Sequence, residues 1–256
     1  MNLSGKVALI TGAAQGLGKA FSESLVSRGA KVCLTDIKVH EGQITTEALK
    51  KNFGNDAAFF MKCDVTSEKE FANVFQAIKS RYGRLDILVN NAGIVDEKNW
   101  RKLIEINLLS VMQGTQLGIE TMSKEHGGNG GVIINISSAA GLTPVFNTPA
   151  YCASKFGVVG YTRSLADNLI HLRNGLRFCC LCPAFTDTDI IKFSENSTVS
   201  TKEIGDKIIK SVGINKVSTV ADGFMELVTD ENNNGAVMTV TARDGIQYKY
   251  LPKSKL

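Results

Sequence analysis

The N-terminal segment joins a short apolar run directly to a glycine-rich stretch. Residues 6–11 are nearly all apolar, a pattern typical of a strand that is buried on both faces of a sheet. Gly12, Gly16 and Gly18 follow, and an apolar periodicity typical of a helix then runs to about Gly29. Glycines so placed permit a tight turn and let backbone N–H groups and a helix N-terminus approach a pyrophosphate closely. This order of elements predicts an α/β domain of the Rossmann type that binds a dinucleotide.

A carboxylate follows the second predicted strand. Residues 31–35 form a further apolar run, and it ends in Asp36. A carboxylate at this place can accept hydrogen bonds from the adenosine ribose hydroxyls and would repel a 2′-phosphate. Ile37 and the Ala13–Ala14 pair supply no Arg or Lys to neutralise such a phosphate, and Lys38 is interpreted as a solvated neighbour. The sequence therefore predicts NAD as the cofactor, in preference to NADP.

Tyr151 and Lys155 lie four residues apart in a predicted helix, shortly after Ser138. Residues at i and i+4 share one face of a helix, so the ammonium is expected to lower the phenol pKa from its usual value of about 10. Such a phenol can take a proton from an alcohol or give one to a carbonyl. Ser138 could donate a hydrogen bond to the same substrate oxygen. Alone, this spacing also arises by chance on solvated helix faces, and the dinucleotide site in the same chain gives it weight.

Strands and helices are predicted to alternate along the whole chain. With 256 residues and 43% hydrophobic content, the chain can bury the core of one large domain. The alternation predicts a single-domain, doubly wound parallel sheet of about seven strands over residues 1–256, with helices on both faces and the ligand site at the carboxyl ends of the strands. The predicted strands are 6–11, 31–35, 58–62, 86–89, 131–137, 176–182 and 236–241, and the predicted helices are 16–28, 41–52, 68–82, 101–125, 150–172 and 218–229.

Composition argues against several other classes of protein. The net charge of +4 is spread along the chain without a basic, aromatic patch, so nucleic-acid binding is not expected. No run approaches the ~18 apolar residues of a membrane span, and the N-terminus lacks a secretory hydrophobic region. Cys179 and Cys182 have a C-x-x-C spacing, but residues three apart on a strand point to opposite faces, which suits neither a chelate nor a disulfide. The histidines show no ligand spacing, and no metal is predicted.

In combination, these motifs resemble the classical branch of the short-chain dehydrogenase/reductase family. The resemblance covers essentially the whole chain and includes the spacing Thr-Gly-x-x-x-Gly-x-Gly from Thr11, the run Asn90-Asn91-Ala92-Gly93, and Cys182-Pro183-Ala184. It implies a catalytic tetrad, in which one Asn holds a water of a proton relay and the Lys also binds the nicotinamide ribose. The tetrad residues are Asn107, Ser138, Tyr151 and Lys155.

The resemblance also implies the residues that contact the cofactor and the substrate. Substrate contacts are expected from Ser138, Thr148, Tyr151 and Phe185. Cofactor contacts are expected from Gly12, Gln15, Gly16, Leu17, Gly18, Asp36, Ile37, Cys63, Asp64, Val65, Asn91, Ala92, Gly93, Tyr151, Lys155, Pro183, Phe185, Thr186 and Thr188.

Within the family, the chain is most similar to the members that oxidise a prostaglandin hydroxyl with NAD. It departs from them in three places: Thr148 replaces a Gln that contacts the substrate hydroxyl, Ala184 replaces a Gly, and the segment 186–217 is shorter. The expected activity is NAD-dependent oxidation of a secondary alcohol to a ketone on a lipophilic substrate. The alternatives are another lipophilic alcohol (a fatty-acid derivative, a steroid or a terpenoid), an activity of the insect alcohol dehydrogenase type, and a non-catalytic NAD-binding module.

Two further expectations concern the substrate cover and assembly. By resemblance, residues 186–217 cover the substrate, and their apolar residues suggest a lipophilic one, although a plain amphipathic helical pair explains the pattern about as well. Related proteins pair through two long helices, here near 101–125 and 150–172, so a homodimer is expected.

The tail, residues 250–256, ends in Ser254-Lys255-Leu256. This tripeptide at a C-terminus is the address that the peroxisomal import receptor reads. The sequence therefore predicts a peroxisomal location. The cytoplasm is the alternative, because the similar vertebrate enzymes are cytosolic and lack this ending.

We expect a fluorescent reporter that carries residues 250–256 at its C-terminus to collect in peroxisomes, because the receptor needs only a free Ser-Lys-Leu end. Deleting Leu256 from the whole protein should return it to the cytosol. Diffuse cytosolic fluorescence of the reporter with the intact ending would contradict this location.

Overall fold

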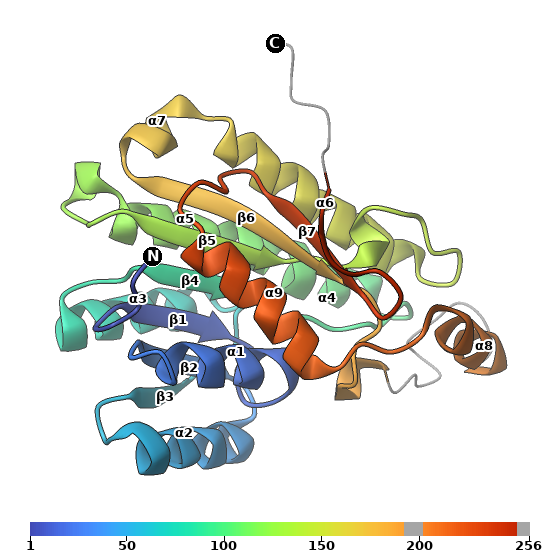
Figure 1. Ribbon diagram of the computed structural model, residues 1–256, viewed down its shortest axis with the longest axis horizontal. Coiled ribbons are helices and arrows are strands. Elements are labelled where there is room, and N and C mark those ends of the chain that lie inside the picture. Colours follow the sequence, from blue (N-terminus) through green and yellow to red (C-terminus); the bar gives the residue numbers. More distant parts are fainter. Residues whose placement is uncertain (192–201, 250–256) are drawn as a thin grey trace.

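A single eight-stranded sheet runs through the molecule in the order β3-β2-β1-β4-β5-β6-β7-β8 (Figure 1). The computed structural model describes residues 1–191 and 202–249. All neighbouring strands are parallel except β7 and β8. The strands are β1 Val7–Thr11, β2 Lys31–Asp36, β3 Ala58–Lys62, β4 Ile87–Asn90, β5 Gly131–Ile136, β6 Leu176–Pro183, β7 Val237–Thr241 and β8 Gly245–Tyr248.

Helices cover both faces of this sheet, and Figure 1 shows α9 crossing one face with α5 and α6 behind the other. The helices are α1 Gly16–Val26, α2 Val39–Phe53, α3 Glu68–Tyr82, α4 Trp100–Ile104, α5 Ser110–Met122, α6 Pro149–Ala166, α7 Leu169–Arg173, α8 Lys202–Val212 and α9 Val217–Thr229.

The position of β1 between two cores explains why its apolar run is continuous. Ala8 and Ile10 join the core on the side of α1 and α9, whereas Val7 and Leu9 join the core on the side of α3. Both faces of β1 are therefore buried, as parallel sheets require. Since β1 pairs with both β2 and β4, the strand order reverses there, and a crevice opens at the carboxyl ends. The predicted doubly wound fold is confirmed.

The structure differs from the predicted elements in three places. An eighth strand, β8, folds back on β7 as an antiparallel hairpin, in which Gly245 has a φ of 68°. The predicted helix 101–125 is divided into α4, a π-helical turn Glu105–Leu109 and α5. The predicted helix 150–172 ends at Ala166, and the short α7 follows. Helical periodicity alone does not reveal such interruptions, because apolar residues keep the same spacing across them.

Part of the predicted cover segment and all of the predicted targeting tail lie outside the described residues. Within 186–217 the structure describes a short 3-10 turn, Asp189–Ile191, and the helix α8. Residues 192–201 and 250–256, which include Ser254-Lys255-Leu256, are not described.

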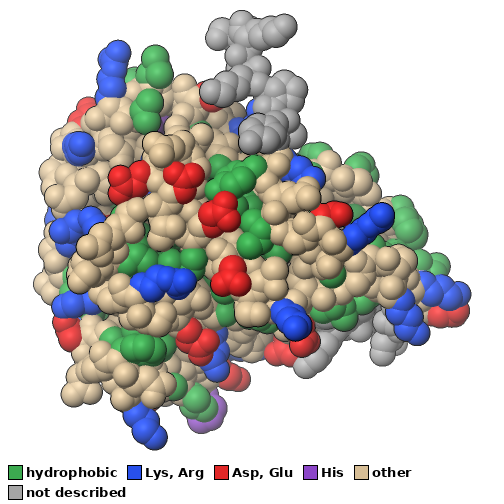
Figure 2. All heavy atoms as spheres, viewed as in Figure 1, with side chains coloured by type: hydrophobic (Ala, Val, Ile, Leu, Met, Phe, Trp, Pro, Cys, Tyr) green, Lys and Arg blue, Asp and Glu red, His purple; other side chains and the backbone are tan. Residues whose placement is uncertain are grey.

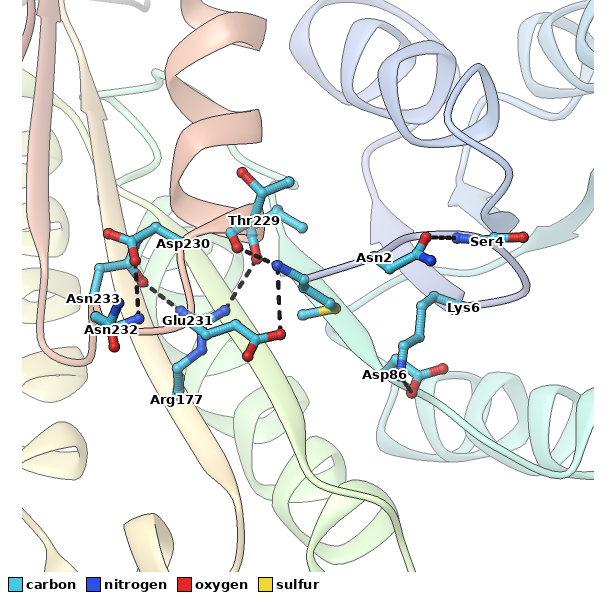
Figure 3. Close-up of polar contacts among 12 residues, drawn as sticks. Asn2, Ser4, Lys6, Asp86, Arg177, Thr229, Asp230, Glu231, Asn232 and Asn233 are labelled. Atoms are coloured by element: carbon cyan, nitrogen blue, oxygen red, sulfur yellow. Dashed lines mark hydrogen bonds and ion pairs between the residues drawn. The ribbon is translucent and has the colours of Figure 1, made fainter.

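Polar contacts join the start of the chain to the end of α9 (Figure 3). The Met1 amino group donates to the Thr229 carbonyl and lies 3.4 Å from the Glu231 carboxylate. The buried Arg177 guanidinium donates to the Asn233 side chain and, at 3.1 Å, to the Val228 carbonyl. A cation is favourable at a helix C-terminus, where carbonyl groups are unpaired.

The surface carries mixed charge. Figure 2 shows Lys and Arg interspersed with Asp and Glu on the face that α9 covers. In the described part of the chain, no helix combines the length and the apolar character that crossing a membrane demands. Residues 1–191 and 202–249 also contain no group of three or more His, Cys, Asp and Glu that could hold a metal ion.

We expect Phe224→Ala to destabilise the protein by about 3–5 kcal/mol, the usual cost of emptying a buried aromatic site. Phe224 of α9 is fully buried and stacks on Phe21 of α1 with ring centroids 4.2 Å apart, so this pair fixes the helix that follows the glycine-rich turn. Urea unfolding measures the change. The control is Phe53→Ala, since Phe53 is 47% exposed and its loss should cost far less. Equal costs for the two variants would contradict this account of the core.

Candidate active site

A cavity of about 610 Å³ lies at the carboxyl ends of the strands. The segments that follow β1, β2, β3, β4, β5 and β6 all contribute to its wall, and Ile208 and Val212 of α8 close one side. This is the crevice at which doubly wound sheets bind their ligands.

The glycine-rich turn forms one end of the cavity. Gly12 and Gly16 have φ values of 63° and 56°, a left-handed conformation that favours glycine. A Cβ at Gly18 would lie 2.3 Å from the Gly12 carbonyl oxygen, so only glycine lets α1 pack this close to the turn. The Asn91 side chain, at the end of β4, donates to the carbonyls of Thr11 and Gly12 at 2.9 and 3.0 Å. These hydrogen bonds tie the turn to the end of the neighbouring strand.

Asp36 lies beside this turn, at the end of β2. Its carboxylate accepts hydrogen bonds from the backbone N–H groups of Ala14 and Lys38, both at 3.0 Å. The Lys38 ammonium donates to the Gln15 side chain at 3.0 Å, and Lys38 lines the cavity. Lys38 is exposed, in agreement with its interpretation as a solvated neighbour, and its contact with Gln15 also places it at the cavity wall.

Every predicted site residue except Gly18 and Asn107 lines the cavity. These residues are Gly12, Gln15, Gly16, Leu17, Asp36, Ile37, Cys63, Asp64, Val65, Asn91, Ala92, Gly93, Ser138, Thr148, Tyr151, Lys155, Pro183, Phe185, Thr186 and Thr188.

The two exceptions are buried beneath the cavity. Gly18 supports the turn, as described above. Asn107 is fully buried in the π-helical turn, where its side chain accepts from the Ile94 N–H and donates to the Ile94 carbonyl, both at 2.8 Å. Its amide also donates to the Ser154 hydroxyl at 3.3 Å. The Asn107 side chain therefore supports the wall that contains Ile94, and its part in a water relay stays a prediction.

The predicted acid–base residues line the same cavity. The Lys155 ammonium lies 5.6 Å from the centre of the Tyr151 ring and donates to the Ile136 carbonyl at 3.0 Å. Ser138 accepts from the Ala140 N–H at 3.1 Å and lines the cavity next to them. The neighbouring Ser137 instead donates to the Lys155 carbonyl at 2.8 Å, a contact that fixes α6 on the sheet.

Burial controls the ionisation of this pair. It raises the pKa of Tyr151 to about 12, and a hydrogen bond with the Ser138 side chain acts in the opposite direction. Burial also lowers the pKa of Lys155 to about 8. The predicted lowering of the Tyr151 pKa is therefore wrong for the protein by itself, because removing the phenol from water favours its neutral form.

The wall near Tyr151 is mostly apolar. Its residues outside the predicted set include Ile94, Val95, Val145 and Asn147. No motif of the sequence marks these four residues. Ile190 and Ile208, which belong to the predicted cover segment 186–217, also line the cavity. The Thr148 hydroxyl lies 4.0 Å from the Cys152 sulfur. Within the described residues, the buried Asn147 side-chain oxygen has no hydrogen-bond partner.

Cys179 and Cys182 point to opposite faces of β6, as predicted. All six cysteines are free and buried. Cys180 and Cys182 share one face of β6 with their sulfurs 3.7 Å apart, whereas Cys179 points to the other face and donates to the Asn233 carbonyl. The C-x-x-C spacing of Cys179 and Cys182 is thus a feature of the core.

The model of the short chain dehydrogenase family matches residues 6–198. The chain belongs to this family. It is 44% identical to 15-hydroxyprostaglandin dehydrogenase [NAD(+)] of Mus musculus over 254 residues, which is 97% of this chain and 94% of the relative. The predicted resemblance, fold and enzyme class are confirmed.

Solved structures share the fold of this chain. Levodione reductase superposes with a TM-score of 0.82 at 26% identity, and the match covers 93% of this chain and 96% of that one. A short-chain dehydrogenase/reductase of Burkholderia phymatum in complex with NAD gives a TM-score of 0.79 at 25% identity, with 89% and 87% covered.

We expect alcohol oxidation to rise as the pH passes about 8. The Tyr151–Lys155 pair loses its first proton there, and oxidation needs the form with one proton fewer, whereas ketone reduction needs the protonated form and should fall.

Tyr151→Phe removes the transferable proton and should lower turnover by about 10²–10⁴-fold while NAD binding is kept. Absorbance of NADH measures turnover and its pH dependence, and titration calorimetry measures NAD binding.

Tyr82→Phe is the control, because Tyr82 lies on α3, outside the residues that line the cavity, and its hydroxyl donates to the Asp56 carbonyl at 3.4 Å. It should keep normal turnover and the same pH profile. Normal turnover of Tyr151→Phe would remove Tyr151 from its role.

Proposed function

We propose that this chain oxidises a secondary alcohol of a lipophilic substrate to the ketone, with NAD as the hydride acceptor. The observation that carries the proposal is that Tyr151, Lys155 and Ser138 line the same cavity as the glycine-rich turn and Asp36. The identity of 44% over almost the whole chain with an NAD-dependent 15-hydroxyprostaglandin dehydrogenase supports the same class of reaction.

The residues of the cavity fit NAD. Gly18 leaves no room for a Cβ, so the N-terminus of α1 lies directly behind the turn and can face a pyrophosphate. Asp36 can accept from the ribose hydroxyls and disfavours a 2′-phosphate. Gly93 and Thr188 line the path from this turn toward Tyr151. When bound, NAD supplies the acceptor for the hydride of the alcohol carbon.

Residues of the chain bind the substrate oxygen and accept the proton of its hydroxyl group. Ser138 holds the substrate oxygen, and the Tyr151 oxygen takes the hydroxyl proton as the carbonyl forms. The Lys155 ammonium, held by the Ile136 carbonyl, stabilises the phenolate that this step requires. Ile94 and Val145 add apolar side chains to the wall of the cavity, and an apolar wall strengthens these interactions when the bound ligands displace water.

A prostaglandin hydroxyl is the first candidate substrate, and another lipophilic alcohol is the second. The first rests on the similarity to the prostaglandin enzyme. The second rests on Thr148, whose shorter side chain faces Cys152 and cannot take the place of the Gln of those enzymes. A role as a non-catalytic NAD-binding module is disfavoured by the intact acid–base set.

Assembly and location extend the proposal. Leu109, Met112 and Phe156 are large apolar side chains that α5, α6 and the preceding π-helical turn leave exposed, which supports a two-fold homodimer through these helices. Delivery to peroxisomes through Ser254-Lys255-Leu256 is proposed from the sequence alone. It suits a fatty-acid-like substrate.

We expect NADH to form when the protein meets NAD and a panel of secondary alcohols that includes prostaglandin E2, a hydroxy fatty acid, a steroid and a terpenoid. NADP should serve far less well, because Asp36 repels its 2′-phosphate. Tyr151→Phe is the matched inactive control. NAD binding with no oxidation of any alcohol would favour the binding module, and equal use of NADP would refute the argument from Asp36.

A further inference from the structure

The helix that carries Tyr151 is capped by a residue from a distant part of the chain. Thr148, at the N-cap of α6, makes no side-chain capping bond, and Pro149 has no N–H. The first free donors of the helix are the N–H groups of Ala150 and Tyr151. Both donate to the Glu97 carboxylate, at 3.0 and 2.9 Å. Glu97 follows β4 and is only 9% exposed.

The same segment forms the cavity wall on the cofactor side. Asn91 through Val95 line the cavity between the glycine-rich turn and Tyr151. Asn107 fixes the middle of this segment through both polar groups of Ile94. Glu97 fixes its far end on α6.

The Tyr151 peptide is tied on both sides. Its N–H goes to Glu97, and its carbonyl accepts from the Ser154 hydroxyl at 2.7 Å. The Ser154 hydroxyl in turn accepts from Asn107. A closed circuit of hydrogen bonds thus runs from Ile94 through Asn107, Ser154 and Tyr151 to Glu97, and the chain between 94 and 97 completes it.

We propose that Glu97 is a positioning residue for the hydride-transfer step. Its carboxylate sets the place of Tyr151 relative to the cofactor-side wall, so that the proton acceptor and the hydride acceptor approach the same substrate carbon and oxygen together. This inference rests on the proposed dehydrogenase function. A carboxylate suits the role because it offers two acceptor oxygens and no donor, and negative charge is favourable at a helix N-terminus.

Single-turnover kinetics of Glu97→Ala and Glu97→Gln test the proposal, with saturating NAD and the best alcohol of the wild-type panel. The rate constant of NADH formation should fall by about 10²-fold in Glu97→Ala, the typical cost of a reacting group displaced by about 1 Å. Glu97→Gln should fall less, since its amide oxygen can accept one N–H while its NH₂ opposes the other. NAD affinity should be unchanged in both variants.

The rate constant separates positioning from stability. A purely structural loss would lower the amplitude, which counts folded protein, and leave the rate constant unchanged. Asn168→Ala is the control, because Asn168 caps α7 in the same way by accepting from the Ile170 N–H at 2.9 Å, and it should keep the wild-type rate constant.

A wild-type rate constant in either Glu97 variant would overturn the role of Glu97, and Glu97→Gln decides the matter if Glu97→Ala does not fold. Failure of the wild-type protein to oxidise any alcohol would instead overturn the proposed function. In that case, amide hydrogen exchange of residues 149–155 in Glu97→Gln still tests the cap: faster exchange supports it, and unchanged exchange refutes it.

Discussion

The hydrogen bonds that Asn91 makes to the carbonyls of Thr11 and Gly12 join the two strand ends around which the site is built. They hold the end of β4 against the turn after β1, at the point where the strand order reverses. Thr11 completes the junction, because its hydroxyl accepts from the N–H groups of Asn91 and Ala92, each at 3.0 Å. The glycine-rich turn and the wall that leads to Tyr151 therefore form one rigid unit.

Burial sets the ionisation of Tyr151 and Lys155, and it makes the charged form of each less favourable. A phenol and an ammonium that face a cavity of mostly apolar wall are both driven toward their neutral forms, which is why the pKa of Tyr151 rises and that of Lys155 falls. The Ile136 carbonyl compensates the ammonium in part. In the proposed reaction, a substrate oxygen that binds between Ser138 and Tyr151 can share a proton with the buried Tyr151 hydroxyl, and such sharing is stabilising where water is excluded.

Local patterns predicted residues that the structure places in one cavity, both around the glycine-rich turn and at Tyr151 and Lys155. Gly12 and Gly16 matter for their backbone conformation, and Asp36 matters because it ends a strand. Both properties can be read from neighbouring residues in the chain. The same reasoning overlooked Ile94, Val145 and Asn147, since an apolar or amide side chain in a loop carries no signal of the cavity it will face. Local patterns also gave no sign that the Lys38 ammonium donates to Gln15, because that contact depends on how the segment after β2 returns to the turn.

The sequence by itself determined the doubly wound sheet, the dinucleotide turn and the spacing of Tyr151 and Lys155, because hydrophobic period, glycine conformation and helical repeat are short-range properties. Only the tertiary structure decided the ionisation of that pair, the π-helical turn that buries Asn107, and the cap that Glu97 places on α6. Glu97 and Tyr151 are far apart in the sequence and meet because β4 and β5 pair and bring their following segments together. Desolvation and hydrogen-bond partners belong to the folded surroundings of a residue, so they exist only once the strands have assembled.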